Sequence, residues 1–226
     1  PLLKSANELD SFLSRESSFL FNNLVLLGIA FATFWGTIFP IISEAVRGVK
    51  ITVGPPFYNQ VNVPIGLALL ALIGIGPVIA WRRATFSNLK KNFLKPILVA
   101  IVVAVALLPV IPLGSRTEIY TYMTFVLCGF VLTSILTEFY KGTVSRMGLH
   151  EESFFGALTT VTWRNKRRYG GYIVHIGVVL IFAGIAGSQA YGTHTEKHLQ
   201  LGESFEIRGY TITYEKIVAI EATSIK

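Results

Sequence analysis

The stretch YIVHIGVVLIFAGIAGSQAY, residues Tyr172–Tyr191, decides the fold class of this chain of 226 residues. It is almost entirely apolar, and an α-helix needs about 20 such residues to cross a bilayer. The whole chain has a mean hydropathy of +0.56. Only 15% of its residues are charged, whereas soluble domains carry about 25%. The sequence therefore predicts a membrane protein, and its single cysteine, Cys128, excludes a disulfide-stapled scaffold.

Four further apolar stretches precede this one, and together they predict an all-α polytopic membrane protein of about five transmembrane helices. The third stretch is the shortest and is closed by Pro109 and Pro112, so a buried or re-entrant helix is its alternative. The transmembrane region is expected over residues 18–192, with spans at about 18–42, 63–81, 96–111, 119–140 and 172–191.

The distribution of Lys and Arg predicts the orientation of the helices, because cytoplasmic loops are enriched in positive charge. One pair of loops holds Arg82, Arg83, Lys90, Lys91, Lys95, Lys141, Arg146, Arg164, Lys166, Arg167 and Arg168, whereas the opposite loops hold only Arg47, Lys50 and Arg116. We expect the lead-in 1–17 on the cytoplasmic side and the tail 193–226 outside. Topology thus explains the net charge of +7 and argues against a nucleic-acid partner.

The tail 193–226 alternates apolar and polar residues between positions 205 and 214, and Arg208-Gly209 interrupts the alternation. This pattern predicts short strands in a small β-rich extracytoplasmic segment. The chain starts at Pro1 and stops inside this strand-like tail, so we expect a piece of a longer or split protein.

Two loops have patterns of their own. Gly54-Pro55-Pro56 predicts a stiff turn in the connector Lys50–Pro64, which is either a rigid link or the mouth of a pocket. Residues Gly148–Thr160 are expected to form a loop or a helix at the membrane surface, because Phe154, Phe155 and Leu158 recur at helical spacing.

His175 is the only histidine within a predicted span, and a titratable side chain in hydrocarbon is a functional candidate by default. Neutral imidazole is a ligand of haem iron. A metal porphyrin bound there would have Arg167 and Arg168 within reach of its propionates. Gly170 and Gly171 would let the flat macrocycle approach the backbone. A histidine that is hydrogen-bonded to a neighbouring helix is the equal alternative.

His194 and His198 have the spacing of two metal ligands on one helix face. No third ligand accompanies them, and the sequence turns into strands at this point. We therefore expect a solvated pair.

Four motifs follow one another in the order found in a known family. They are SRESSFLFNNLVLL (Ser14–Leu27), GTIFPIISEA (Gly36–Ala45), ITVGPPFYNQV (Ile51–Val61) and RRYGGYIVHIGVVLIFAGIAGS (Arg167–Ser188). Over this range the chain resembles the C-terminal part of the CcmF family, the large haem-handling proteins of cytochrome c maturation system I. The NrfE-type haem lyases share these motifs.

The resemblance implies part of a haem lyase, which attaches haem covalently to apocytochrome c. It implies haem b as cofactor, with His175 as an axial ligand of the haem iron, because His175 matches the second transmembrane haem-b histidine of the family. It implies membrane lipid, the N-terminal part of the same protein, CcmH/CcmI-type subunits, the haem chaperone CcmE and apocytochrome c as partners. The implied location is the bacterial inner membrane, or the mitochondrial inner membrane for a split organellar homologue.

Several family features have no counterpart in this sequence. These are the WWD segment, its two outer-loop histidines and the partner transmembrane histidine, so the segment alone completes neither haem site. No residue is a candidate general acid or base, and whether the chain is an enzyme stays open. Two other functions also stay open. The first is a transporter or channel subunit, favoured by prolines within the spans but not by any charge at mid-membrane. The second is a non-catalytic membrane scaffold.

Overall fold

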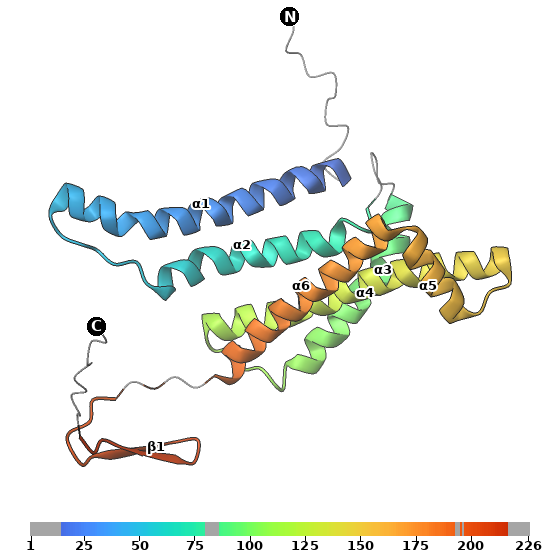
Figure 1. Cartoon of the computed structure of the whole chain (residues 1–226). Coiled ribbons are helices and arrows are strands. Elements are labelled where there is room, and N and C mark those ends of the chain that lie inside the picture. The colour runs from blue at the N-terminus through green and yellow to red at the C-terminus, as the bar shows by residue number, and fades with distance from the viewer. Residues whose placement is uncertain (1–14, 80–85, 193–194, 196, 217–226) are drawn as a thin grey trace, which may run out of the picture. The chain divides into compact units, whose positions relative to one another are not determined.

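The computed structural model describes residues 15–79, 86–192, 195 and 197–216, and the chain divides into two units, Pro1–Tyr191 and Gly192–Lys226. The first unit is helical and the second holds a hairpin (Figure 1). The helices are α1 (Arg15–Arg47), α2 (Pro55–Ile75), α3 (Phe86–Leu107), α4 (Arg116–His150), α5 (Phe154–Arg164) and α6 (Lys166–Tyr191), and the strands are β1 (Ser204–Ile207) and β2 (Tyr210–Thr213).

Four helices in the described part of the chain, α1, α2, α4 and α6, are long and apolar enough to cross a membrane. The expected fold class, an all-α polytopic membrane protein with a small β tail, is confirmed. Helix α3 overlaps the third predicted span but is not among the four, because Lys90, Lys91 and Lys95 charge its N-terminal half. Its C-terminal half leaves Ile101 and Val102 more than half exposed, which argues against a fully buried helix.

Helix α2 differs from its predicted span at both ends. The stiff turn expected at Gly54-Pro55-Pro56 is instead the start of the helix, and Gly54 is its extended N-cap residue. Proline fits the first helical turn because its fixed φ is helical and the N–H that it lacks would have no intrahelical partner there. The helix ends at Ile75 rather than near Trp81, and Trp81 lies outside the described residues.

Helix α4 is longer than its predicted span, 119–140. Ser115 caps its N-terminus by accepting a hydrogen bond from the Glu118 N–H at 3.2 Å, while the Ser115 N–H donates to the Glu118 carboxylate at 2.7 Å. This reciprocal capping box satisfies two N–H groups. The helix ends where Glu151 adopts φ 50°. Arg146 donates hydrogen bonds to Glu152 just beyond the helix, and these bonds lower the pKa of the Glu152 carboxyl.

Helix α4 packs against α2, α3 and α6 around a small apolar core, and α1 packs against α2. Leu70, Val131, Ile135 and Val179 are the main buried aliphatic residues of this core. At Gly74 of α2, an added Cβ would lie 2.6 Å from the ring of Phe130. The close contact of α2 with α4 therefore depends on a residue without a side chain.

Helix α4 also packs against α6 through sulfur and aromatic contacts. Cys128 is buried, and its Sγ donates to the Val179 carbonyl with a sulfur–oxygen distance of 3.7 Å. The rings of Phe139, Tyr169 and Tyr172 meet in tilted and edge-on arrangements at centroid distances between 5.0 and 5.9 Å. Such arrangements are favourable for aromatic pairs, so they fix the N-terminal end of α6 against α4.

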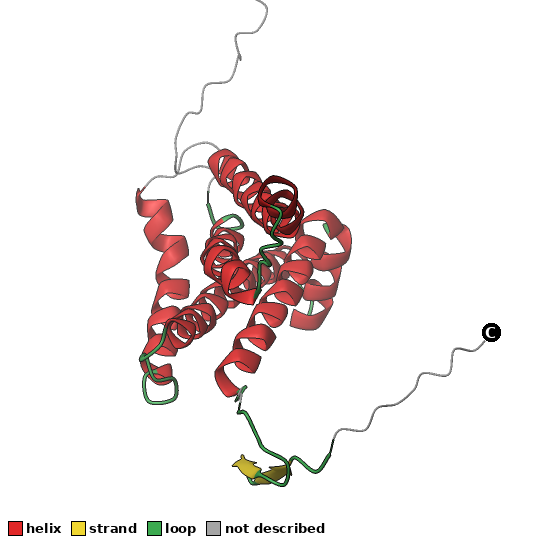
Figure 2. Cartoon of the chain, turned by 90° about the vertical axis from the view of Figure 1, so that its left-hand side faces the viewer, coloured by secondary structure: helices red, strands yellow, loops and turns green. Residues whose placement is uncertain are grey.

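The second unit contains an antiparallel hairpin in which Ser204 pairs with Thr213 and Ile207 with Tyr210 (Figure 2). Arg208 and Gly209 form its two-residue loop with φ values of 47° and 80°. Two successive positive φ values are typical of the turn whose twist matches a β-hairpin, and glycine adopts them most easily. The strand-rich tail with a turn at Arg208-Gly209 is therefore confirmed.

Candidate functional site

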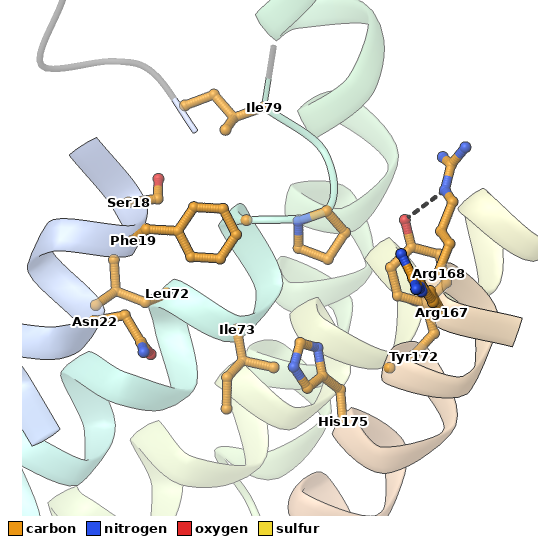
Figure 3. Close-up of a pocket in the computed structure, with 13 residues that line it drawn as sticks. Ser18, Phe19, Asn22, Leu72, Ile73, Ile79, Arg167, Arg168, Tyr172 and His175 are labelled. Atoms are coloured by element: carbon orange, nitrogen blue, oxygen red, sulfur yellow. Dashed lines mark hydrogen bonds between the residues drawn. The ribbon is translucent and has the colours of Figure 1, made fainter. Parts of the chain in front are cut away.

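A cavity of about 690 Å³ lies at one end of the helical unit. The N-terminal end of α1, the C-terminal end of α2 and the N-terminal half of α6 enclose it (Figure 3). Pockets that hold small molecules have volumes of roughly 300–1,000 Å³. The cavity is lined by all three residues that the sequence analysis selected, His175, Arg167 and Arg168.

His175 reaches this cavity from α6 and is half-buried there. Its Nδ1 atom is buried and has no hydrogen-bond partner. Nearly all buried polar side-chain atoms in proteins are hydrogen-bonded, so an unpartnered imidazole nitrogen requires an explanation. The alternative of a hydrogen bond to a neighbouring helix finds no support in the described residues.

Arg168 lines the cavity, but its guanidinium is already engaged. One terminal nitrogen donates to the Glu138 carboxylate at 2.5 Å, and Nε donates to the Tyr172 hydroxyl at 3.0 Å. Glu138 lies on α4 with only 11% of its side chain exposed, and it also pairs with Lys141 at 3.2 Å. Sequence reasoning missed this ion pair, because Glu138 is remote from Arg168 along the chain.

Arg167 is the cation of the cavity that remains available. Its side chain is exposed, and no ion pair to it occurs among the described residues. The neighbouring Gly171 also lines the cavity, and a Cβ added there would meet no atom within 4 Å. Open space over this backbone is what the sequence analysis expected for a flat ligand. Gly170 is equally open but is not part of the lining.

Helix α1 supplies a wall that the sequence analysis did not assign to the site. Phe19 and Asn22 of α1 lie with Leu72 of α2 on one side of the cavity, opposite Arg167 and Arg168 (Figure 3). The only early signal was the pair of polar residues Asn22-Asn23 in an apolar span. The sequence could not predict which helix they would face. Phe19 and Leu72 thus give one wall of the cavity apolar surface beside Asn22, whereas Arg167 and Arg168 make the opposite wall basic, and an imidazole lies between the two walls.

The other histidines do not form a second metal site in the described residues. His150 and His198 are exposed, and no group of three His, Cys, Asp or Glu side chains could hold an ion there. His194 lies outside the described residues, so the solvated pair with His198 stays a prediction.

Known proteins that resemble the chain share a common description. The cytochrome c-type biogenesis protein CcmF of Haemophilus influenzae is 28% identical over 201 residues, which cover 89% of this chain and 30% of that protein. The CcmF protein of Pseudomonas fluorescens is 28% identical over 202 residues, which cover 89% of this chain and 29% of that protein. The chain is similar to CcmF-type proteins over most of its length. The resemblance to the C-terminal part of CcmF is confirmed.

An NrfE protein is similar as well. The cytochrome c-type biogenesis protein NrfE of Haemophilus influenzae is 22% identical over 218 residues, which cover 91% of this chain and 29% of that protein. The chain spans about 30% of the length of its CcmF-type relatives. No protein-family model and no solved structure matches it. The apolar helices and the CcmF-type relatives together identify a multi-pass membrane protein.

The cavity combines features that suit an amphipathic anion with a metal centre. His175 offers an imidazole, Arg167 offers a positive charge that has no ion pair among the described residues, and Gly171 offers open backbone. Imidazole nitrogen is an established ligand of haem iron. The residues present therefore fit haem b, with a single axial ligand from the part of the chain that the structure describes.

Proposed function

We propose that the chain is part of a haem lyase of cytochrome c maturation, and that it supplies one axial histidine to a b-type haem. The observation that supports this proposal most directly is that His175, whose Nδ1 has no hydrogen-bond partner, lines a cavity of about 690 Å³. The names of the CcmF-type relatives, which are cytochrome c-type biogenesis proteins, support the pathway.

Each residue of the cavity would have a defined task. His175 would hold the iron from α6, and Arg167 would bind a propionate, because a guanidinium forms strong charge-assisted hydrogen bonds with a carboxylate. Arg168 would act less on the ligand than the sequence suggested, because Glu138 already neutralises it. Phe19 and Leu72 would exclude water from one side. When bound, haem supplies an iron that changes oxidation state.

The remaining parts of the site would come from outside this chain. A second axial ligand is absent from the described lining, so we propose that the N-terminal part of a CcmF-type protein provides it. Haem delivery by a CcmE-type chaperone, docking of CcmH/CcmI-type subunits and attachment to apocytochrome c belong to the same proposal. We place the complex in the bacterial inner membrane. The contribution of this chain to catalysis is then positioning, which holds reacting groups together.

A reduced-minus-oxidised absorption spectrum tests the axial role of His175. The chain is co-expressed with the N-terminal part of a CcmF-type protein, as wild type, as His175→Ala and as His150→Ala. His150 is exposed at the end of α4 and does not line the cavity, which makes it the matched control. We expect a b-type α-band in the wild type and in His150→Ala, and a loss of most of this band in His175→Ala.

Two outcomes would contradict the proposal, and a rescue experiment would support it. An equal band in all three forms would refute axial ligation by His175. A complex that is intact but colourless in all forms would refute the haem-lyase function, and would favour the transporter or scaffold interpretation. Restoration of the band in His175→Gly by added imidazole would show that the lost group is the ligand and not a packing contact.

A further inference from the structure

A second cavity, of about 680 Å³, lies near the N-terminal end of α2 and the C-terminal end of α6, opposite to the ends of these helices that line the first cavity. It is formed by the N-terminal parts of α2 and α4 and the C-terminal part of α6. Tyr58 and Asn59 of the segment 50–64, which was expected to form either a rigid link or the mouth of a pocket, contribute to its lining. The haem proposal makes no use of this cavity.

The cavity is polar at the end of the helices and apolar further in. Asn59, Arg116 and Gln189 lie near the helix ends, whereas Leu67 and Phe182 lie deeper along the same helices. Eight residues separate Asn59 from Leu67, which corresponds to about 12 Å along a helix. The cavity therefore suits a ligand with a polar head and an apolar tail parallel to the helices.

The polar end carries a positive charge that none of the residues described by the structure neutralises. No ion pair to Arg116 occurs among the described residues, and this side chain lines the cavity. The nearby carboxylate of Glu118 accepts a hydrogen bond from the Ser115 N–H and is not part of the lining. Arg116 is also the first residue of α4, where the helix dipole favours an anion.

A buried acceptor supplies an independent observation. Asn62 lines the same cavity, and its Oδ1 is buried without any hydrogen-bond partner, while its Nδ2 donates only a long bond of 3.4 Å to Thr33. A buried amide oxygen that lacks a donor is costly. Asn59, Asn62 and Arg116 line the same cavity, so a ligand that bears a hydroxyl group beside its anionic group suits both the amides and the cation.

The lining also restricts what the ligand can be. No histidine, cysteine, methionine or carboxylate belongs to it, so none of the usual metal-binding side chains is available there. We propose that this cavity binds an anionic phospholipid with a hydroxylated head group, of the phosphatidylglycerol type. The phosphate lies at Arg116, and one acyl chain runs along α2 and α6 towards Phe182.

Native mass spectrometry of the full chain in a mild detergent tests this site. Dioleoylphosphatidylglycerol is titrated against dioleoylphosphatidylcholine, which has the same acyl chains without net charge. We expect phosphatidylglycerol to remain bound to the wild type and to bind Arg116→Gln at least about tenfold more weakly, since a hydrogen bond to a charged group contributes about 1.5–3 kcal/mol. Arg47→Gln is the matched control, because Arg47 ends α1 outside the lining.

Each alternative result has a separate meaning. Equal binding of the two lipids, or unchanged binding by Arg116→Gln, would overturn the site. An equal loss in Arg47→Gln would also overturn it, because lipid binding would then depend on the net charge of the chain and not on the charge in the cavity. Binding of glycerol phosphate as tightly as the whole lipid would show that a free phosphate ester and not an acyl chain occupies the cavity. None of these results depends on haem, so they leave the proposed function untouched.

Discussion

Arg168 lines the candidate haem cavity and also takes part in the packing of α6 against α4. Its guanidinium is bound by Glu138 and by the Tyr172 hydroxyl, yet 53% of its side chain is exposed. Glu138 is far less exposed, and a carboxylate in such a place needs a partner. Glu138 is therefore a positioning residue for Arg168.

Replacement of Glu138 by Gln is expected to lower the free energy of unfolding by about 1 kcal/mol. The effect stays modest because water can solvate the exposed guanidinium once its partner is lost. Unfolding of the purified chain by SDS in mixed micelles, followed by circular dichroism, measures the change. Glu44→Gln is the control, since Glu44 is exposed. Equal destabilisation by both variants would contradict a role for the Glu138–Arg168 pair.

At the residue scale, much of what the sequence predicted about the cavity followed from helical spacing. Arg167, Gly171 and His175 lie four residues apart, so a helix places them on one face, and all three line the cavity. The partner of Arg168 could not be predicted in this way, because an ion pair between helices depends on how the helices pack.

At the scale of elements, the contact between α2 and α4 depends on Gly74. A Cβ at this position would lie 2.6 Å from Phe130 and 3.0 Å from Val131. Neither neighbour can withdraw freely, because Val131 is fully buried and the ring of Phe130 stacks on Phe93 with their centroids 6.3 Å apart. The two helices must therefore separate to accept even one methyl group.

Gly74→Ala is expected to destabilise the helical unit by about 1–3 kcal/mol, which is typical of overpacking in a well-packed core. Gly28→Ala provides the comparison, because a Cβ at Gly28 in α1 would meet no atom within 4 Å. There we expect a gain of about 0.5–1 kcal/mol from the better helix propensity of alanine. The same SDS titration measures both. A neutral or stabilising Gly74→Ala would refute the close contact.

Hydropathy predicted the presence of the helices better than it predicted their ends. The N-terminal end of α2 was missed because Pro55 and Pro56 favour a turn as well as the first turn of a helix. The length of α4 was missed because its last part, from Lys141 to His150, is polar and lies beyond the apolar stretch. Boundaries of this kind depend on capping residues such as Ser115 and Glu151, the latter in the left-handed conformation. A single residue of this kind is only a weak signal in a sequence.

For the whole molecule, the asymmetry of Lys and Arg leads to a test of orientation. We expect Gly148 at the end of α4 on the cytoplasmic side and Leu201 in the tail on the opposite side. Both residues are exposed. Each is replaced by Cys in a Cys128→Ala background and treated in intact cells with a membrane-impermeant maleimide. Leu201→Cys should react, and Gly148→Cys should react only after lysis; the reverse result would invert the topology.

The sequence could not predict how the helices surround the two cavities. The apolar face of α1 gives no sign that Phe19 and Asn22, rather than other residues of α1, border the cavity of His175. That selection follows from the packing of α1 on α2. The hairpin, in contrast, depends on local alternation and on one turn, so the sequence predicted it well.

The buried position of Cys128 has a consequence for redox experiments. Thioether formation on an apocytochrome requires reduced cysteines, and any other accessible thiol would compete through disulfide exchange. The chain has one cysteine. It is 5% exposed, and its thiol donates a hydrogen bond to a backbone carbonyl of α6. A buried thiol of this kind is inert. A thiol-blocking reagent added to an assay of the proposed haem attachment would therefore react with the cysteines of the apocytochrome and not with this chain.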